Sequence, residues 1–263
     1  MSKFLEIALD VAREAGKIQI KSLGKVIDIG YKGKGKNNVV TEVDKKCEAF
    51  IVKQIKKAFP DHAFLAEEGT AEDSKTPYKW IIDPLDGTVN YSHAHPVFAV
   101  SIGLEYKGKM IAGACYGPML DEMYWAELGK GAYCNGKKIH VTKTSSLETA
   151  MVCTGFAYDV KTNPLNNLNN FSAFILKAQA VRRDGAAVLN ICYTARGRYD
   201  GFWELYLNPW DVAAATLILT EAGGKVTKLD GSKYSVYGYE TLCSNGKIHR
   251  AMIDVLKKAN PRT

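Results

Sequence analysis

The sequence lacks closely spaced cysteines and histidines of the kind that bind zinc. No CxxC pair and no HExxH spacing occurs in it. Disulfide frameworks are typical of short secreted chains, and zinc sites need ligands that lie close together. We therefore predict that the cysteines are small, mostly buried apolar residues. The six cysteines are Cys47, Cys115, Cys134, Cys153, Cys192 and Cys243.

Long apolar runs are also missing, since none approaches the roughly 20 residues that span a bilayer. The first residues, 1–6, enter an amphipathic pattern at once, so we expect no signal peptide and a soluble, cytoplasmic protein. With 263 residues, 46% of them hydrophobic, the chain needs no disulfide or structural metal to form a core. The length suits one large domain or two tightly packed halves.

A formal net charge of +7 suggests either nucleic acid or a phosphorylated metabolite as a partner. The basic stretches, residues 31–38 and Lys257-Lys258, do not interleave aromatic residues with lysine or arginine as a single-strand binding platform would. We interpret the charge as mild electrostatic steering of a phosphorylated small molecule. Nucleic acid is not expected as the main partner.

Apolar periodicity predicts a helix over residues 3–22 and a second one over 41–59, ended by Pro60. Between them, residues 25–40 read as two short extended pieces around a glycine-lysine tip, 32–36. A glycine-rich tip of this kind can change conformation at little cost.

The remaining pattern predicts strands from residue 63 to 139, with a hairpin formed by 97–106 and 110–116. After about residue 145, strands and helices alternate. We therefore expect an α+β half, residues 1–145, packed tightly against an α/β half, residues 146–263. The expected strands of the second half are 151–154, 178–181 and 199–203, and the expected helices are 186–195, 210–222 and 247–258.

Two aspartates follow a short apolar run, Trp80–Ile82, which we interpret as a buried strand. Asp83 and Asp86 are three positions apart, and Pro84 between them disfavours helix at Asp83. An isolated DxxD is usually turn and cap chemistry. The full string from residue 80 to 90 is much more specific.

The residues after these aspartates suit an anion. Gly87 permits a sharp turn, and Thr88 can begin a short helix whose first amide groups point outward. One turn therefore brings two carboxylates, the Leu85 carbonyl and an amide cluster together. Hard oxygen ligands of this kind suit Mg²⁺ far better than zinc.

Three further acidic segments could converge on this turn, and each has a simpler explanation. Glu67, in the pair Glu67-Glu68, could belong to a solvated loop. Asp211 follows Asn208 at the start of a predicted helix and could serve only the helix dipole. Asp44 fits a capping box with Thr41. Spacing alone does not decide between these alternatives.

At this point the sequence resembles the inositol monophosphatase family. Residues 83–91 resemble its DP(I/L)DGT-x-N-(F/Y) signature, and residues 210–224 resemble its second signature, WD-x-A-A-G…EAGG. The segments Glu67-Glu68, Thr41–Asp44 and Arg182–Ala187 fall in the family's order and spacing. The resemblance covers essentially the whole chain. It implies a layered αβαβα sandwich fold in a protein that is usually dimeric. It also implies that the protein hydrolyses phosphate monoesters with two or three Mg²⁺ ions and is inhibited by lithium.

The resemblance also implies roles for individual residues. The hydroxyl of Thr88, polarised by Asp44, would orient the attacking water, and a third ion would lie near Glu67. The implied metal ligands are Glu67, Asp83, the Leu85 carbonyl, Asp86 and Asp211. The implied substrate-binding residues are Asp86, Gly87, Thr88, Arg182, Ala187, Glu204 and Asp211.

Two points of the resemblance concern basic residues. Arg182 and Arg183 should point to opposite faces of a strand, and alignment favours Arg182 on the active-site side, with Arg183 on a surface or interface. Which of Lys32, Lys34 and Lys36 faces the site stays open.

For the substrate we expect myo-inositol 1- or 4-monophosphate, with fructose 1,6-bisphosphate or other sugar phosphates as the alternative. The non-enzymatic alternative is an RNA- or transcription-associated accessory protein.

Overall fold

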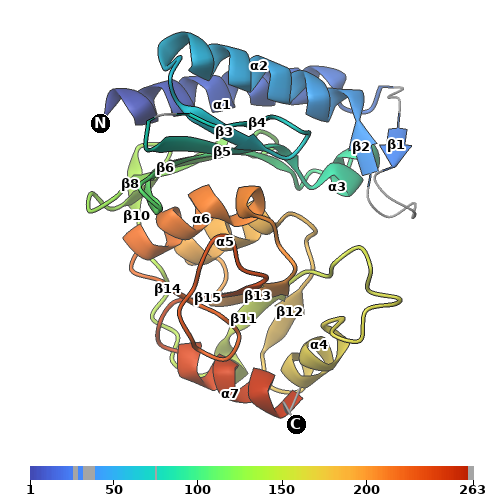
Figure 1. The fold of residues 1–263 in the computed structure, drawn as a ribbon. Coiled ribbons are helices and arrows are strands. Elements are labelled where there is room, and N and C mark those ends of the chain that lie inside the picture. The colour runs from blue at the N-terminus through green and yellow to red at the C-terminus, as the bar shows by residue number, and fades with distance from the viewer. Residues whose placement is uncertain (26–28, 32–38, 75, 260–263) are drawn as a thin grey trace.

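The computed structural model describes residues 1–25, 29–31, 39–74 and 76–259. It has five layers in the order helices, sheet, helices, sheet, helices (Figure 1). The outer helices α1 (Lys3–Ser22) and α2 (Glu42–Ala58) cover one sheet, and α4 (Leu168–Ile175) and α7 (His249–Ala259) cover the other. The αβαβα sandwich implied by the resemblance is therefore confirmed.

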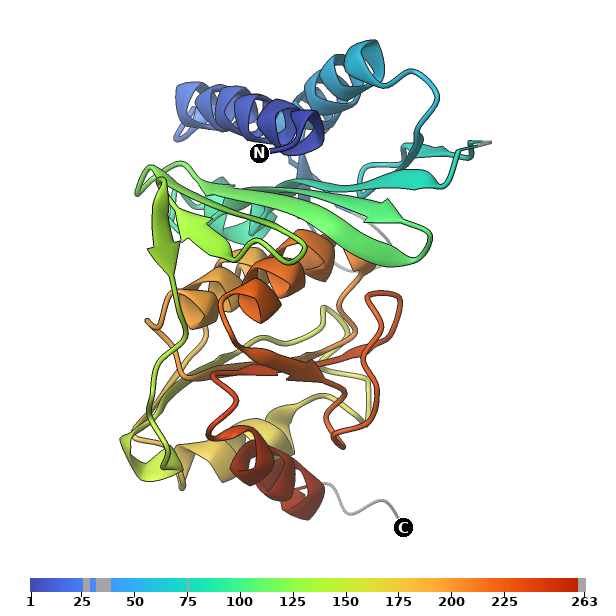
Figure 2. The same cartoon turned by 90° about the vertical axis from the view of Figure 1, so that its left-hand side faces the viewer.

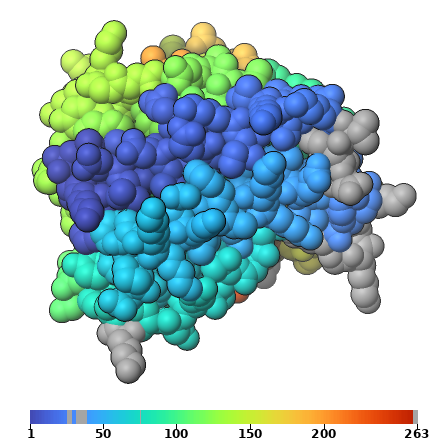
Figure 3. All heavy atoms as spheres, turned by 90° about the horizontal axis from the view of Figure 1, so that it is seen from above, coloured from blue at the N-terminus to red at the C-terminus, as the bar shows by residue number. Residues whose placement is uncertain are grey.

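The first two helices match the predicted ranges because a residue that can cap a helix immediately precedes each of them. The Ser2 side chain accepts a hydrogen bond from the Leu5 amide and begins α1, and Thr41 with Asp44 forms a capping box that begins α2. The two helices lie side by side on the outer face of the sheet (Figure 3). A short antiparallel pair, β1 (Ile29–Tyr31) and β2 (Val39–Thr41), connects them, and the predicted tip, residues 32–36, lies outside the described residues.

The sheet under these helices has eight strands in the order β10-β9-β8-β7-β6-β5-β3-β4. All pairs are antiparallel except β3 with β5. The predicted hairpin is confirmed, since Lys107 and Gly108 adopt positive φ between β6 and β7. The strands are β3 (Ala63–Ala66), β4 (Ala71–Glu72), β5 (Tyr78–Asp86), β6 (Ala99–Tyr106), β7 (Lys109–Gly117), β8 (Glu122–Glu127), β9 (Ala132–Cys134) and β10 (Lys137–Ile139).

The second sheet has five strands in the order β12-β11-β13-β15-β14. Its pairs are parallel at β12-β11-β13 and antiparallel from β13 onward, which the sequence did not indicate. The strands are β11 (Met151–Thr154), β12 (Ala180–Arg182), β13 (Gly201–Leu205), β14 (Lys225–Thr227) and β15 (Glu240–Ser244), and a short 3₁₀ turn, Leu147–Thr149, precedes them.

Helices α5 (Ala187–Ala195) and α6 (Pro209–Glu221) form the central layer between the two sheets (Figure 2). Glycines of the first sheet let α6 approach closely, because a Cβ added to Gly113 would lie 2.9 Å from the Ala214 carbonyl oxygen. The two expected halves are thus in tight contact. The boundary at residue 145 stays a prediction.

All six cysteines are buried free thiols, as predicted. Within the described residues, no helix combines the length and apolar character needed to cross a membrane.

Candidate active site

A cavity of about 600 Å³ lies where the end of β5 meets β13 and the start of α6. Residues from both expected halves line it. The sequence-predicted residues among them are Glu67, Asp86, Gly87, Thr88, Ala187, Glu204 and Asp211. Asp44, Asp83 and Leu85 are buried behind this lining.

The two aspartates of the central motif belong to strand β5 rather than following it, which corrects the expected strand end at Ile82. The pairing of β5 with β6 shifts by one residue between Asp83 and Asp86. Pro84 lies in this irregularity, where its missing amide hydrogen is tolerated. Asp83 Oδ1 accepts a hydrogen bond from the Leu85 amide at 2.9 Å, so the bulge itself holds the carboxylate in place.

The turn after β5 requires glycine. Gly87 has φ +88° and precedes α3 (Thr88–Ser92), which begins where it was predicted. A Cβ at Gly87 would lie 2.8 Å from the Val97 carbonyl oxygen. The turn therefore packs directly against neighbouring backbone, and it brings the backbone of Gly87 and Thr88 to the cavity surface.

Thr88 connects the cavity to Asp44. Its hydroxyl donates to Asp44 Oδ1 at 2.9 Å, and the Leu85 carbonyl oxygen lies 3.1 Å from it. The second Asp44 oxygen accepts from the Thr41 amide at 2.9 Å and from the Thr41 hydroxyl. Asp44 therefore caps α2 and also binds the Thr88 hydroxyl, and its role in the reaction stays a prediction. Burial raises the pKa of Asp44.

The acidic residues of the site influence one another strongly. Burial and the charge of Glu67 raise the pKa of Asp83 and Asp211 well above their usual range. The pKa of Asp86 is raised to about 7, mainly by burial, and the charge of Glu67 adds to the shift. These four carboxylates come from three distant segments of the sequence and lie in one region, where Asp83 and Asp86 are buried and Glu67 and Asp211 are half-buried.

Their carboxylate oxygens are nevertheless not arranged around a common point. In the part of the chain that the structure describes, no three His, Cys, Asp or Glu side chains have the spacing of a metal site. Mutual repulsion favours separation, and backbone amides attract three of the carboxylates. The amide donors are Leu85 to Asp83, Ala187 and Val188 to Asp86, and Asn208 to Asp211.

Asp86 links the two expected halves. Its oxygens accept from the amides of Ala187 at 3.2 Å and Val188 at 2.8 Å, at the start of α5. The Ala187 amide thus binds Asp86, although a substrate was the expected partner for Ala187. No sequence signal could have shown this contact, because 101 residues separate Asp86 from Ala187.

Glu204 lines the cavity from β13. Burial raises its pKa to about 8, and the positive charge of Arg183 opposes the shift. An added Cβ on Gly155 would collide with the Glu204 carboxylate, so the chain after β11 packs closely against this side chain.

The arginine pair differs from the prediction. Both arginines are exposed, but Arg183 lines the cavity and Arg182 does not; Arg182 donates to its neighbour's carbonyl, Val181 O, at 3.2 Å. The alternation rule does not reach Arg183, because β12 ends at Arg182 and Arg183 lies in the turn that follows, where Gly185 has φ +82°. The loop residues Phe156, Tyr158 and Tyr206 also line the cavity and were not predicted.

The comparisons with known proteins agree with one another. A family model described as "Inositol monophosphatase family" matches residues 1–260. The chain is 40% identical to the fructose-1,6-bisphosphatase/inositol-1-monophosphatase of Aquifex aeolicus, covering 98% of this chain and 97% of that protein. It is 38% identical to the Nus factor SuhB of Pseudomonas aeruginosa, with 99% and 98% coverage. The solved inositol monophosphatase of Anabaena (Nostoc) sp. PCC 7120 has a TM-score of 0.89, 39% identity, and 98% and 96% coverage.

Proposed function

Because the chain belongs to the inositol monophosphatase family, whose members hydrolyse phosphoric monoesters, we propose that it removes phosphate from myo-inositol 1- or 4-monophosphate with Mg²⁺ as cofactor. One observation carries this proposal. Glu67, Asp83, Asp86 and Asp211 lie close enough to raise one another's pKa beside the turn at Gly87, with Asp83 and Asp86 buried and Glu67 and Asp211 half-buried, and an anion can approach the backbone amides of that turn.

The donor atoms of these residues suit Mg²⁺, although their side chains do not have the spacing of a metal site in this structure. Their donors are carboxylates and one backbone carbonyl, which are the hard oxygen ligands that this ion prefers. Buried carboxylates that repel one another are costly, and a divalent cation would neutralise them. The proposed ligands are Glu67, Asp83, the Leu85 carbonyl, Asp86 and Asp211, with a third, weaker ion near Glu67. When bound, Mg²⁺ would offset the charge of the phosphate and lower the pKa of water.

The protein's own groups position the attacking water. Because the Thr88 hydroxyl donates its hydrogen to Asp44, its oxygen lone pairs are left to accept a hydrogen bond from a water molecule in the cavity. Burial of Asp44 keeps this pair away from bulk solvent. We propose that Thr88 and Asp44 orient the water toward phosphorus, while the Gly87 and Thr88 amides hold the phosphate.

The other end of the cavity would hold the polyol. Glu204, with a pKa of about 8, is protonated at neutral pH and can both donate to and accept from hydroxyl groups. Arg183 adds a cation beside it. We propose these two residues, rather than Arg182, as the contacts for the leaving alcohol.

A second substrate class is favoured by the same arginine. Arg183 would give a second phosphate a positive partner, which suits a sugar bisphosphate. The Aquifex aeolicus relative carries both activities in its name. Fructose 1,6-bisphosphate is therefore the alternative substrate. Unlike inositol monophosphate it has a second phosphate, which would bind Arg183.

Phosphate release from a panel of monoesters tests the proposal. We expect inositol monophosphate to be hydrolysed with Mg²⁺ and not with a chelator, and Asp83→Asn to reduce kcat at least about 100-fold. The same proposal includes inhibition by lithium. It also includes a homodimer, which light scattering measures. Absence of hydrolysis of every monoester in Mg²⁺ would refute it. If wild type and Asp83→Asn then captured RNA or transcription proteins equally, the non-enzymatic alternative suggested by the SuhB name would replace it.

A further inference from the structure

The backbone of Tyr206 is left-handed, which is unusual for a bulky side chain. Its φ is +63°, and among the described residues no other aromatic residue has a φ in this region. A Cβ crowds the backbone at such a φ, so glycine or asparagine is the normal choice. This chain follows that rule at most of its described positive-φ positions, including Gly87 and Gly185. An aromatic residue at a strained position indicates that its side chain is needed there.

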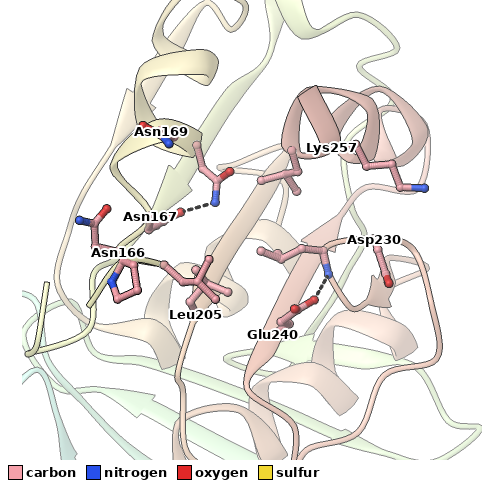
Figure 4. A pocket seen from close by; sticks show the side chains of 12 residues that line it. Asn166, Asn167, Asn169, Leu205, Asp230, Glu240 and Lys257 are labelled. Carbon is pink, nitrogen blue, oxygen red and sulfur yellow. Dashed lines mark hydrogen bonds between the residues drawn. The ribbon is translucent and has the colours of Figure 1, made fainter. Parts of the chain in front are cut away.

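Tyr206 lies where β13 ends and the chain turns into α6. Side chains alternate along a strand. The Leu205 side chain packs against the outer core that contains Trp203, and it lies among the residues of a second cavity, between α4 and α7 (Figure 4). Glu204 and Tyr206, on either side of Leu205, both line the active-site cavity. Tyr206 is therefore a close neighbour of the residue that we propose as a polyol contact.

Contacts with two other segments hold Tyr206 in this place. Its amide donates to the Tyr239 carbonyl at 2.6 Å, which extends the pairing of β13 with β15 by one residue. The centroids of the Tyr206 and Tyr239 rings are 6.2 Å apart. The Tyr206 hydroxyl lies 3.5 Å from Asn163 Oδ1, in the loop that also brings Phe156 to the cavity. The half-buried ring thus connects the end of β13 with the loop between β11 and α4.

The cavity lining around Tyr206 combines polar and apolar groups. Glu204 and Arg183 offer hydrogen-bond partners, and Phe156 and Leu207 offer apolar surface. A cyclic polyol has a complementary surface, with hydroxyl groups around its edge and C–H groups on its faces. Burial of a C–H face against an aromatic ring removes apolar surface from water. A short acyclic alcohol has no such face.

We propose that Tyr206 is a specificity-determining residue, whose ring contacts a C–H face of the leaving alcohol and favours cyclic polyol or sugar phosphates over acyclic ones. This inference rests on the proposed function, because the alcohol is placed beside Glu204. The left-handed backbone is the cost of holding the ring in the cavity lining. Since the phosphate is proposed to bind at Gly87 and Thr88, loss of the ring should leave phosphate binding in place.

Titration calorimetry in a Thr88→Val background at saturating Mg²⁺ measures binding without turnover. This background lacks the hydroxyl proposed to orient water and keeps every proposed metal ligand. The probes are myo-inositol 1-phosphate and glycerol 2-phosphate, two phosphates of secondary alcohols that differ in carbon skeleton. Adding Tyr206→Asn removes the ring but suits a left-handed backbone. It should weaken binding of the inositol phosphate about tenfold and of the glycerol phosphate less than about threefold.

Two matched variants separate the ring from other effects. Tyr206→Phe keeps the ring, and it should bind both probes within about threefold of the background. Tyr239→Asn removes an exposed ring that touches Tyr206 but does not line the cavity, and it should do the same. With Thr88 intact, Tyr206→Asn should raise the KM for inositol phosphate and change kcat less than about threefold, because the ring binds substrate and transition state alike.

Three results would overturn the proposal. Equal weakening of both probes by Tyr206→Asn would show a structural role, and unchanged binding of inositol phosphate would show that the ring makes no contact. Failure of the Thr88→Val background to bind inositol phosphate is the third. If binding changes as expected but the protein with Thr88 intact releases no phosphate from either probe, the proposed function fails and the contact with Tyr206 stands.

Discussion

At the scale of single residues, the acids of the site also hold the backbone. Asp44 caps α2, Asp86 binds the first amides of α5, and Asp211 accepts from the Asn208 amide at the start of α6. A carboxylate with such a second partner is restricted to few orientations. Each of these side chains therefore has a structural contact in addition to its proposed role, and its removal should affect both.

The arginine pair gives a direct prediction. Arg183→Gln should raise the KM for inositol monophosphate about tenfold, because a charged hydrogen-bond donor is lost from the cavity. Arg182→Gln is the matched control, and it should change the KM less than twofold because Arg182 does not line the cavity. Steady-state kinetics of the two variants decide the matter. A larger effect of Arg182→Gln would restore the assignment made from the sequence.

His249 predicts how stability depends on pH. It is buried between the Thr227 and Ser244 hydroxyls, and burial, aided by Lys225, lowers its pKa from 6.5 to about 4. In the unfolded chain the imidazole takes up a proton near pH 6.5, so its stabilising contribution is complete above that pH and declines as pH falls toward 4. Urea unfolding between pH 7.5 and 4 measures this decline.

The control for this prediction is His249→Gln. It should cost about 1–3 kcal/mol at pH 7.5, where two buried hydrogen bonds are lost, and less at pH 4.5. A constant difference between variant and wild type across this range would contradict the assigned pKa.

At the scale of elements, the turn from β5 into α3 depends on glycine for two reasons. Gly87 needs a positive φ, and its Cα faces the Val97 carbonyl oxygen. Gly87→Ala should destabilise the protein by about 2 kcal/mol or more. Gly108→Ala is the matched control, because Gly108 has φ +77° with no atom within 4 Å of an added Cβ. It should cost about 1 kcal/mol. Equal losses in thermal unfolding would show that the close contact contributes nothing.

At the scale of the whole molecule, the acidic region draws on both expected halves, since Asp211 comes from α6 and the other three acids come from the first 86 residues. Mg²⁺ should therefore stabilise the folded chain as a whole. At 100 times its dissociation constant it adds about 2.7 kcal/mol, which corresponds to a rise in Tm of about 5–10 °C. Thermal unfolding with Mg²⁺ and with chelator measures this.

The variant Asp83→Asn should abolish most of this rise in Tm and, in chelator, should be no less stable than the wild type, because it replaces a buried carboxyl group whose ionised form is disfavoured by burial and by the neighbouring acids. An equal rise in both proteins would place the Mg²⁺ effect outside this site.

The sequence by itself determined the elements whose signals are local. The start of α1, the cap at Thr41, the glycine turn at Gly87 and the hairpin at Lys107-Gly108 lie where they were predicted, because each depends on neighbours within a few residues. Helix α4 was not predicted, since it is short and has no side-chain cap at Asn167. The expected site residues were also found by local motifs, and most of them line one cavity.

Only the tertiary structure decided which distant groups meet. Three features depend on how elements far apart in the sequence pack. They are the antiparallel pairing of β13 with β15, the contact of Asp86 with α5, and the presence of Arg183 rather than Arg182 in the cavity lining. The physical reason is that a local pattern fixes backbone conformation and the alternation of side chains along a strand. Contacts between elements that are distant in the sequence decide which face lines a cavity, and residue spacing within one element does not reveal these contacts.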